Sequence, residues 1–511
     1  MRFGNDMITF EEAVAYLKDM PRFTVKKNPA DSRDLKWFLK KLGNPEKDLR
    51  IIHVAGTNGK GSVCAYMSSI LREAGYRTAV FTSPHLVDMR ERFAVNGEMI
   101  SEEAFLQEFL AVWDALQETN SANTGDGQRG EEAPQEFVLN FYEYLFCMAL
   151  LCFAEEKPDY CIIETGLGGR LDATNYVDNK LLTVITRISL DHVQYLGDTT
   201  AKIAAEKAGI LRPGVPVVYL DGDADASAVI CRKASELGAI QIPVSKKDYT
   251  FLGFRKKYID FSLRSEYYNY ISLTLHTIAR YQMENAALAV RAVEVLFRST
   301  DMPDGRMCAA SGCPTVEEIR QGILGCFWQG RMEEVLPEVY VDGAHNDDGI
   351  RAFLDTVEQD GCTEGRRLLF GVAADKVCRH MIQRVITSGL FDRIAFTHMR
   401  TARSLSLEEL KGLLAAYPED RFTMYTEADT ALRTEVSGRQ PGERLYIAGS
   451  LYLVGEIRRL WTMINFEEEL KKFHPSLEVE DAEEAIYNQD LTDAADLLVK
   501  MIKESEEKEE K

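Results

Sequence analysis

The chain has 511 residues, more than one compact core usually holds, so we expect two domains with appendages. Its content of 45% hydrophobic and 28% charged residues is ordinary for a globular protein. The net charge of −21 argues against a general nucleic-acid binder, which normally carries a basic surface. No apolar run approaches the roughly 20 residues that span a membrane, and the N-terminal residues lack the apolar core of a secretion signal.

The ten cysteines are spaced neither as a disulfide framework nor as a zinc site. We therefore expect free thiols in a reducing cytoplasm. The acidic balance also means that local donors and metal ions must bind any anionic substrate, because the overall field repels it.

Short apolar runs alternate with amphipathic stretches through the N-terminal part of the chain, a pattern typical of βαβ units and a parallel sheet. Strands are expected at 49–54, 78–81, 160–163, 182–188 and 215–220. Helices are expected at 63–74, 199–211, 224–237 and 281–297. Loops are expected at 119–136 and 299–314, and an antiparallel flap of two or three strands at 249–276.

A second α/β unit is expected from about Gly330, with strands at 338–342, 368–372, 393–397, 422–425 and 444–448. The fold class is thus α/β: a P-loop-type, mostly parallel N-terminal sheet domain and a smaller, Rossmann-like C-terminal domain. The predicted domains are 1–329 and 330–465, followed by an acidic, helix-forming extension at 466–511.

The strongest local signal is a glycine-rich run between a strand and a helix, Gly56-Thr57-Asn58-Gly59-Lys60-Gly61-Ser62. Glycines let backbone N–H groups surround phosphate oxygens, and the following helix N-terminus adds partial positive charge. Lys60 would reach the β- and γ-phosphates, and the Ser62 hydroxyl can meet Mg²⁺. The strict P-loop consensus is not met, because Val54 and Gly61 stand where it requires Gly and Ser or Thr. A chance glycine-rich turn is the alternative.

This run resembles that of the folylpolyglutamate and dihydrofolate synthase family, relatives of the Mur peptidoglycan ligases. Mur enzymes typically lack the extra glycine between the lysine and the hydroxyl residue, so Gly61 favours the folate branch. Other segments that match the family's strings are 82–86, 164–175, 191–192, 206–210, 282–287, 328–331, 342–346, 371–376 and 449–455.

The resemblance implies an ATP- and Mg²⁺-dependent ligase that adds L-glutamate to a folate-type acceptor through an acyl phosphate. The implied ATP-binding residues beyond the loop are Asn285, Arg331, Asp342 and His345. The implied metal ligands are Ser83, Glu164, His192 and, if carbamylated, Lys207. The implied catalytic residues are Lys60, Lys207, Glu164 and His192. The implied acceptor contacts are Tyr142, Glu143, Leu171, Asp172 and Ala173.

Three positions depart from the family pattern: Tyr142 stands where a phenylalanine is usual, Phe146 where a threonine is usual, and Gln329 replaces a proline. The acceptor therefore stays open between dihydropteroate, reduced folate or both. The alternatives to a folate ligase are a Mur-type ligase acting on a UDP-sugar peptide, a P-loop phosphotransferase or hydrolase, and a non-catalytic nucleotide-binding module. The family suggests a cytoplasmic monomer, and neither a nucleic acid nor a membrane is expected as a partner.

Overall fold

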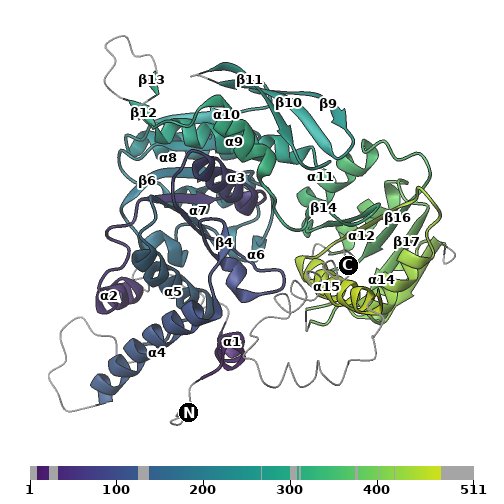
Figure 1. Ribbon diagram of the computed structural model, residues 1–511, viewed down its shortest axis with the longest axis horizontal. Helices are drawn as coiled ribbons and strands as arrows, with labels where there is room; N and C mark the ends of the chain where they lie inside the picture. The colour runs from purple at the N-terminus through teal and green to yellow at the C-terminus, as the bar shows by residue number, and fades with distance from the viewer. Residues whose placement is uncertain are drawn as a thin grey trace, which may run out of the picture. The chain divides into compact units, whose positions relative to one another are not determined.

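The computed structural model describes residues 8–21, 33–124, 137–265, 268–299, 308–309, 312–374, 378–401, 403–418 and 421–472. The chain up to Arg458 forms one compact unit, and Arg459–Lys511 forms a second. The first unit contains two large sheets with helices packed against them (Figure 1). No helix in the described ranges is long and apolar enough to cross a bilayer.

The N-terminal sheet has eight strands in the order β4-β3-β2-β5-β1-β6-β7-β8. All neighbours are parallel except at the β2–β3 and β3–β4 pairs. The strands are β1 (Ile51–Ala55), β2 (Thr78–Phe81), β3 (Phe93–Val95), β4 (Glu98–Met99), β5 (Tyr160–Glu164), β6 (Lys180–Ile185), β7 (Val217–Leu220) and β8 (Gln241–Val244).

Successive residues of a strand point to opposite faces of the sheet. Helices cover both faces, so the side chains on both are buried. Ile52 and Val54 of β1 join a core cluster with α3 and α9, whereas Ile51 joins a second cluster with α4 and α5. The helices are α1 (Phe10–Asp19), α2 (Arg33–Lys41), α3 (Lys60–Glu73), α4 (Glu102–Thr124), α5 (Phe141–Glu156), α6 (Val193–Leu196), α7 (Thr200–Lys207), α8 (Ala224–Glu236), α9 (Tyr281–Leu296) and α10 (Val316–Gly325).

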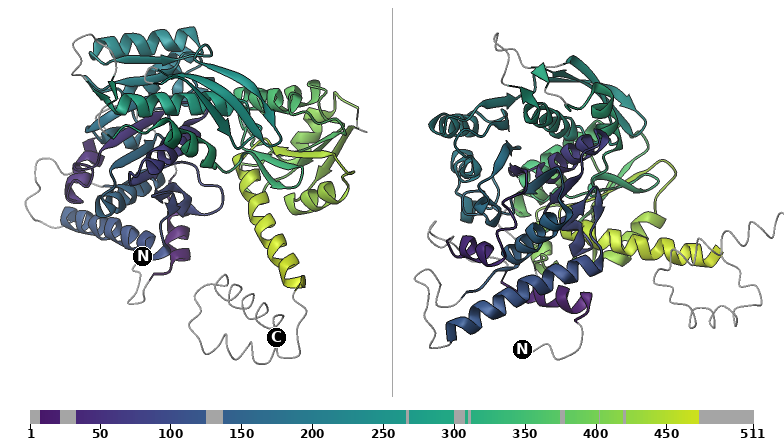
Figure 2. Two further views of the ribbon diagram at one scale, coloured as in Figure 1. Left: turned by 45° about the horizontal axis from the view of Figure 1, so that its top comes forward. Right: turned by 60° about the vertical axis from the view of Figure 1, so that its left-hand side comes forward.

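The predicted flap is a three-stranded antiparallel sheet of β9 (Tyr249–Arg255), β10 (Tyr258–Ser265) and β11 (Asn269–Leu275). Figure 2 shows these strands beside α9 and α10, which they contact. Alternate residues of β10, Ile259, Phe261 and Leu263, are fully buried against the helices. The alternation that predicted the flap therefore reflects one buried and one exposed face.

The second sheet has six strands in the order β14-β15-β19-β16-β17-β18, of which only the β14–β15 pair is antiparallel. Its strands are β14 (Arg331–Leu336), β15 (Val339–Asp342), β16 (Arg366–Phe370), β17 (Arg393–Thr397), β18 (Phe422–Tyr425) and β19 (Arg444–Ala448). Its helices are α11 (Asp347–Glu358), α12 (Cys378–Thr387), α13 (Leu407–Leu414), α14 (Ala428–Ser437) and α15 (Leu451–Lys472).

The predicted fold class is confirmed, and four strands, β2, β17, β18 and β19, have the predicted bounds. The loop predicted at 119–136 is wrong at its start, because α4 continues to Thr124; residues 125–136 lie outside the described ranges. Apolar residues spaced by three or four positions, from Phe105 through Phe109 to Leu116, bury one face of α4 and sustain the helix.

Three further expectations need correction. Strand β14 was not predicted, since its alternation is short and polar. The loop predicted at 299–314 overlaps the last residue of β12 (Arg298–Ser299) and contains β13 (Cys308–Ala309), which pairs with it. The strand predicted to end at residue 188 ends at Ile185. The predicted extension is described only to Lys472, the end of α15, and the three-part domain division stays a prediction.

The carboxyl group of Glu108 on α4 makes the stability of this layer depend on pH. Its side chain is 5% exposed, and burial together with the neighbouring Glu155 carboxylate raises the pKa of Glu108 to about 7. The folded state therefore holds this proton more tightly than the unfolded chain, in which a glutamate pKa is near 4.5. As the pH rises from about 4.5 to about 7, the free energy of unfolding must fall.

We expect Glu108→Gln to remove this loss and to raise the free energy of unfolding near pH 8 by about 1–3 kcal/mol, with a smaller gain near pH 5.5. Thermal unfolding of both proteins at the two pH values measures the difference. Glu118→Gln, at an exposed position on the same helix, is the control. A gain that is equal at both pH values would contradict the assignment.

Candidate active site

The glycine-rich run forms a phosphate loop at the carboxyl end of β1, in the centre of the sheet. Gly56 has no room for a side chain, because a Cβ there would lie 1.8 Å from Thr186 Oγ1. Gly59 has a φ of +89°, and its Cβ would lie 2.2 Å from Asn285 Oδ1. Gly56 also has a positive φ, of +155°, so both positions require glycine for space and for backbone conformation.

Gly61 is constrained from the segment that joins the two sheets. Its Cβ would lie 2.7 Å from Cζ2 of the Trp328 ring. One residue further along α3, the Ser62 hydroxyl accepts a hydrogen bond of 3.2 Å from the Gln282 amide, whose oxygen in turn accepts one of 2.8 Å from Asn285. The predicted ATP residues on the loop and on α9 thus lie together.

A buried carboxylate faces the phosphate loop. Glu164, the last residue of β5, is 3% exposed and accepts a hydrogen bond of 3.0 Å from the Ser83 backbone N–H. Lys60 Nζ lies 3.7 Å from its other oxygen and donates a 3.2 Å hydrogen bond to the Thr57 carbonyl. Burial raises the pKa of Glu164, whereas the Lys60 ammonium opposes that rise.

A second lysine approaches the loop from α7. Lys207 is 4% exposed, and its Nζ donates a 2.6 Å hydrogen bond to the Gly56 carbonyl. Burial and, to a lesser degree, the charge of Lys60 lower the pKa of Lys207 to about 7. Close to neutral pH, the Lys207 side chain is therefore an uncharged amine in a large share of the molecules.

The His192 side chain belongs to the segment between β6 and α6. It is half-exposed, its backbone is left-handed with a φ of +48°, and it stands at the N-cap of the short helix α6. The adjacent Asp191 carboxylate accepts a 2.7 Å hydrogen bond from the His192 backbone N–H.

Of the predicted acceptor residues, Tyr142 contacts the carboxyl end of β5. Tyr142 donates a 2.9 Å hydrogen bond to the Glu164 carbonyl, and its ring fills the space beside Gly166. Glu143 is buried and accepts a 3.0 Å hydrogen bond from the Asn140 backbone, which completes the capping box of α5. The Glu143 carboxylate therefore has a structural contact of its own.

Asp172 is turned into its own loop. Its oxygens accept hydrogen bonds from the backbone N–H of Leu167 at 2.8 Å and from the backbone N–H and hydroxyl of Thr174 at 3.0 and 2.5 Å. Since the only hydroxyl proton of Thr174 goes to Asp172, His53 Nε2 must be the donor in its 2.8 Å contact with Thr174. The predicted neighbours, Leu171 and Ala173, are half-buried and buried.

The predicted nucleotide residues of the second sheet form a separate small group. Asp342, which is 2% exposed, accepts hydrogen bonds from the Tyr281 hydroxyl at 2.5 Å and from the backbone of Met332 and Ala344 at 3.0 and 2.8 Å. His345 Nδ1 donates a 2.7 Å hydrogen bond to the Gly343 carbonyl. Arg331 lies against Gly343, where a Cβ would be 2.6 Å from Nη1.

The residues present can supply hard oxygen ligands of the kind that Mg²⁺ prefers. Within the described residues, no three His, Cys, Asp or Glu side chains come together as a metal-binding group. A cation here would instead depend on the Ser83 hydroxyl, the Glu164 carboxylate and the His192 imidazole, with water and phosphate oxygens. These donors fit Mg²⁺, because the buried Glu164 carboxylate lies 3.7 Å from the Lys60 ammonium and a further positive charge would stabilise its ionised form.

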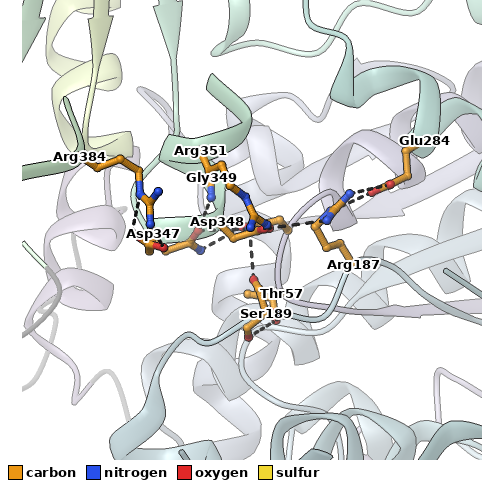
Figure 3. Close-up of polar contacts among 11 residues, drawn as sticks. Thr57, Arg187, Ser189, Glu284, Asp347, Asp348, Gly349, Arg351 and Arg384 are labelled. Atoms are coloured by element: carbon orange, nitrogen blue, oxygen red, sulfur yellow. Dashed lines mark hydrogen bonds and ion pairs between the residues drawn. The ribbon is translucent and has the colours of Figure 1, made fainter. Parts of the chain in front are cut away.

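Three residues that follow β6, Thr186, Arg187 and Ser189, hold the phosphate loop and were not predicted as site residues. The Thr186 hydroxyl donates a 2.8 Å hydrogen bond to the Asn58 carbonyl, and the Arg187 carbonyl accepts one of 2.8 Å from the Thr57 backbone. Thr57 and Ser189 exchange hydrogen bonds of 3.1 and 3.2 Å (Figure 3). The available signal was position: Thr186 and Arg187 lie at the end of the strand predicted at 182–188, in the same parallel sheet as β1, and Ser189 follows it.

Residues 330–451 match the domain family described as Mur ligase, glutamate ligase domain. This match coincides with the second sheet, and it accompanies a phosphate loop and a buried carboxylate in the first. The fold and the site together define an ATP-dependent ligase that forms C–N bonds.

Relatives match along nearly the whole chain. The dihydrofolate synthase/folylpolyglutamate synthase of Bacillus subtilis is 34% identical over 460 residues, which cover 88% of this chain and 98% of the relative. The folylpolyglutamate synthase of Lacticaseibacillus casei is 29% identical over 461 residues, with the same coverage of 88% and 98%. The chain belongs to the folylpolyglutamate and dihydrofolate synthase family.

Solved structures agree with this assignment. An FPGS–AMPPCP–folate complex has a TM-score of 0.72 at 27% identity, over 88% of this chain and 99% of that chain. The folylpolyglutamate synthase of Thermotoga maritima has a TM-score of 0.70 at 27% identity, over 89% and 96%. The resemblance drawn from the sequence is confirmed, and the three alternatives to a folate ligase are set aside.

The contact between Gly61 and Trp328 gives a first test of the site. Gly61 has an ordinary helical backbone, so alanine there meets only the rigid indole ring. Overpacking of this size costs about 1–3 kcal/mol, so we expect Gly61→Ala to lower kcat/KM for ATP about tenfold.

The double variant Gly61→Ala/Trp328→Leu removes the clash and should recover part of this loss relative to Trp328→Leu alone. Steady-state ADP release at varied ATP concentration measures all four proteins. Additive effects of the two substitutions would show that the contact does not shape the loop.

Proposed function

We propose that the protein adds L-glutamate to folate-type acceptors at the expense of ATP, and that it accepts both dihydropteroate and reduced folates. Family membership supports the ligation of glutamate to a folate. The name of the Bacillus subtilis relative includes both synthase activities, which supports the double specificity. The observation that carries the proposal is the buried Glu164 carboxylate 3.7 Å from Lys60, between the phosphate loop and the loop of Asp172.

The reaction needs an acceptor carboxylate that is electrophilic near neutral pH. In the proposed route this carboxylate attacks the γ-phosphorus of ATP, the bond to the β-phosphate oxygen breaks, and ADP leaves. The glutamate amine then attacks the acyl carbon, loses a proton, and phosphate departs. Lys60 and Arg331 would offset the negative charge of the transferring phosphoryl group, which is mainly electrostatic and positional catalysis.

The phosphate loop, from Gly56 to Ser62, would hold the ATP phosphates, with Asn285, Asp342 and His345 as further nucleotide contacts. Ser83, Glu164 and His192 would hold Mg²⁺, which supplies charge neutralisation at the phosphates when bound. Tyr142 and the loop organised by Asp172 would form the acceptor side, with the half-buried Leu171 and the buried Ala173 as neighbours. Glu143 would act there through α5.

Lys207 is proposed to work as a carbamate. Its buried amine, whose pKa is about 7, can attack CO₂ and lose a proton, which gives a carboxylate-like group. That group would join Glu164 in binding a second cation. The same proposal includes a cytoplasmic location, a monomeric state and the three-part domain division 1–329, 330–465 and 466–511. The free thiols of the described cysteines fit a reducing cytoplasm.

The activity is tested by ADP release from purified protein with ATP, Mg²⁺, L-glutamate and either dihydropteroate or tetrahydrofolate. We expect release with both acceptors, dependent on glutamate. Lys60→Ala and Glu164→Ala should lower turnover by at least about a thousandfold, because each removes a charge that acts on the reacting groups, and circular dichroism should show an intact fold. Release with tetrahydrofolate alone would contradict the proposed activity with dihydropteroate. Near-normal turnover in either variant would contradict the proposed roles of Lys60 and Glu164.

Carbamylation is tested by ¹³C NMR of protein equilibrated with ¹³C-bicarbonate. We expect one carbamate resonance in the wild type and none in Lys207→Arg, whose guanidinium stays protonated and cannot attack CO₂. Lys180→Met, which removes another buried lysine whose pKa is lowered, to about 6, is the control and should keep the resonance. A resonance that persists in Lys207→Arg would place the modification elsewhere.

A further inference from the structure

The phosphate loop is joined to the second sheet by a pair of asparagine side chains. Asn346 is the N-cap of α11, and its Oδ1 accepts a 2.8 Å hydrogen bond from the Gly349 backbone N–H. The same amide exchanges hydrogen bonds with Asn58: Asn346 Nδ2 donates at 3.0 Å, and Asn58 Nδ2 donates back at 3.2 Å. Asn58 Nδ2 also donates to Asp348 at 3.0 Å.

The second N–H of Asn346 reaches a different loop. It donates a 2.9 Å hydrogen bond to the Asp191 carboxylate, next to His192. Both donors and both acceptor sites of the amide are thereby used, and the side chain is only 3% exposed. The Gly349 N–H requires an oxygen on one side and the Asp191 carboxylate requires an N–H on the other, so the orientation of the amide is fixed.

Ion pairs surround this contact (Figure 3). Asp348 lies 3.9 Å from Arg187, which forms two hydrogen bonds of 2.9 and 2.7 Å with Glu284 on α9. On the far side, Asp347 forms two hydrogen bonds of 2.9 Å with Arg384 of α12. Asp348 therefore faces the first sheet, whereas the polar contacts of the Asp347 side chain within the described residues are with Arg384 of the second sheet's helix α12.

We propose that Asn346 is a positioning residue that couples the seating of the second sheet on the phosphate loop to the orientation of Asn58 and Asp191. This inference rests on the proposed function. One side chain holds a phosphate-loop residue and the neighbour of a proposed metal ligand at once. When Asn58 and Asp191 are both held in place, the acyl phosphate is protected from hydrolysis, because it must react with the glutamate amine before water reaches it.

If the coupling is lost, water takes the place of the amine. It attacks the acyl carbon, the bond to the phosphate oxygen breaks, and the acceptor carboxylate, phosphate and a proton are released. ATP is then consumed without an amide product. The ratio of ADP released to glutamate incorporated therefore reports on positioning in a way that a loss of folded protein does not.

The test is Asn346→Asp, an isosteric change that keeps a good N-cap for α11. It replaces both N–H donors by oxygen, which then faces Asn58 Oδ1 and the Asp191 carboxylate. We expect the ADP-to-product ratio to rise severalfold and KM for glutamate to rise about tenfold, with helix content unchanged. The matched control is Asp347→Asn, which alters the same helix end without touching the first sheet and should keep the wild-type ratio.

A uniform fall in kcat at an unchanged ratio and KM would assign Asn346 a merely structural role and overturn the proposal. If Asn346→Asp does not fold, Asn346→Ser, which still caps the helix but is too short to reach Asn58, must show the same rise in the ratio. The wild-type protein separates the two hypotheses: without acceptor-dependent ADP release from it, the proposed function fails whatever Asn346 does.

Discussion

The packing of other side chains into the space above the glycines of the phosphate loop is the constraint on which the rest of the structure depends. Thr186 occupies the space at Gly56, Asn285 the space at Gly59, and Trp328 the space at Gly61. These side chains come from the end of β6, from α9 and from the segment before β14. The loop is therefore the point at which the first sheet, its covering helix and the entry to the second sheet are fitted together.

Close packing also explains how an acidic chain can serve an anionic nucleotide. With a net charge of −21, the overall field repels ATP, so attraction must be local. Two lysines, Lys60 and Lys207, lie at the loop, one of them fully enclosed, and the buried Glu164 is the carboxylate nearest to Lys60. In such surroundings each charge acts strongly on its neighbours, because little water separates them. Burial, rather than net charge, sets the electrostatics of this site.

Features carried by local pattern could be predicted from the sequence. The parallel sheet, the flap and the phosphate loop each have a run of residues whose spacing or type specifies them, and the resemblance gave the family. Contacts between distant segments had no such signal. Asn346 belongs to the segment 342–346, which resembles the family. Nothing in the sequence indicates that the two N–H groups of its side chain reach Asn58 and Asp191. In the same way, the end of α4 depends on a face buried by tertiary packing.

The extra glycine of the loop shows how such contacts restrict what each element can be. Adding one residue between Lys60 and Ser62 rotates the hydroxyl by about 100° around α3, since a helix has 3.6 residues per turn. In this structure the rotated hydroxyl accepts a hydrogen bond from Gln282 of α9, and the inserted position lies under the Trp328 ring. Glycine is the only residue that leaves room for that ring without moving it. The insertion, the tryptophan and the glutamine therefore form one unit, and a change at any of them alters how the two sheets meet at the phosphate loop.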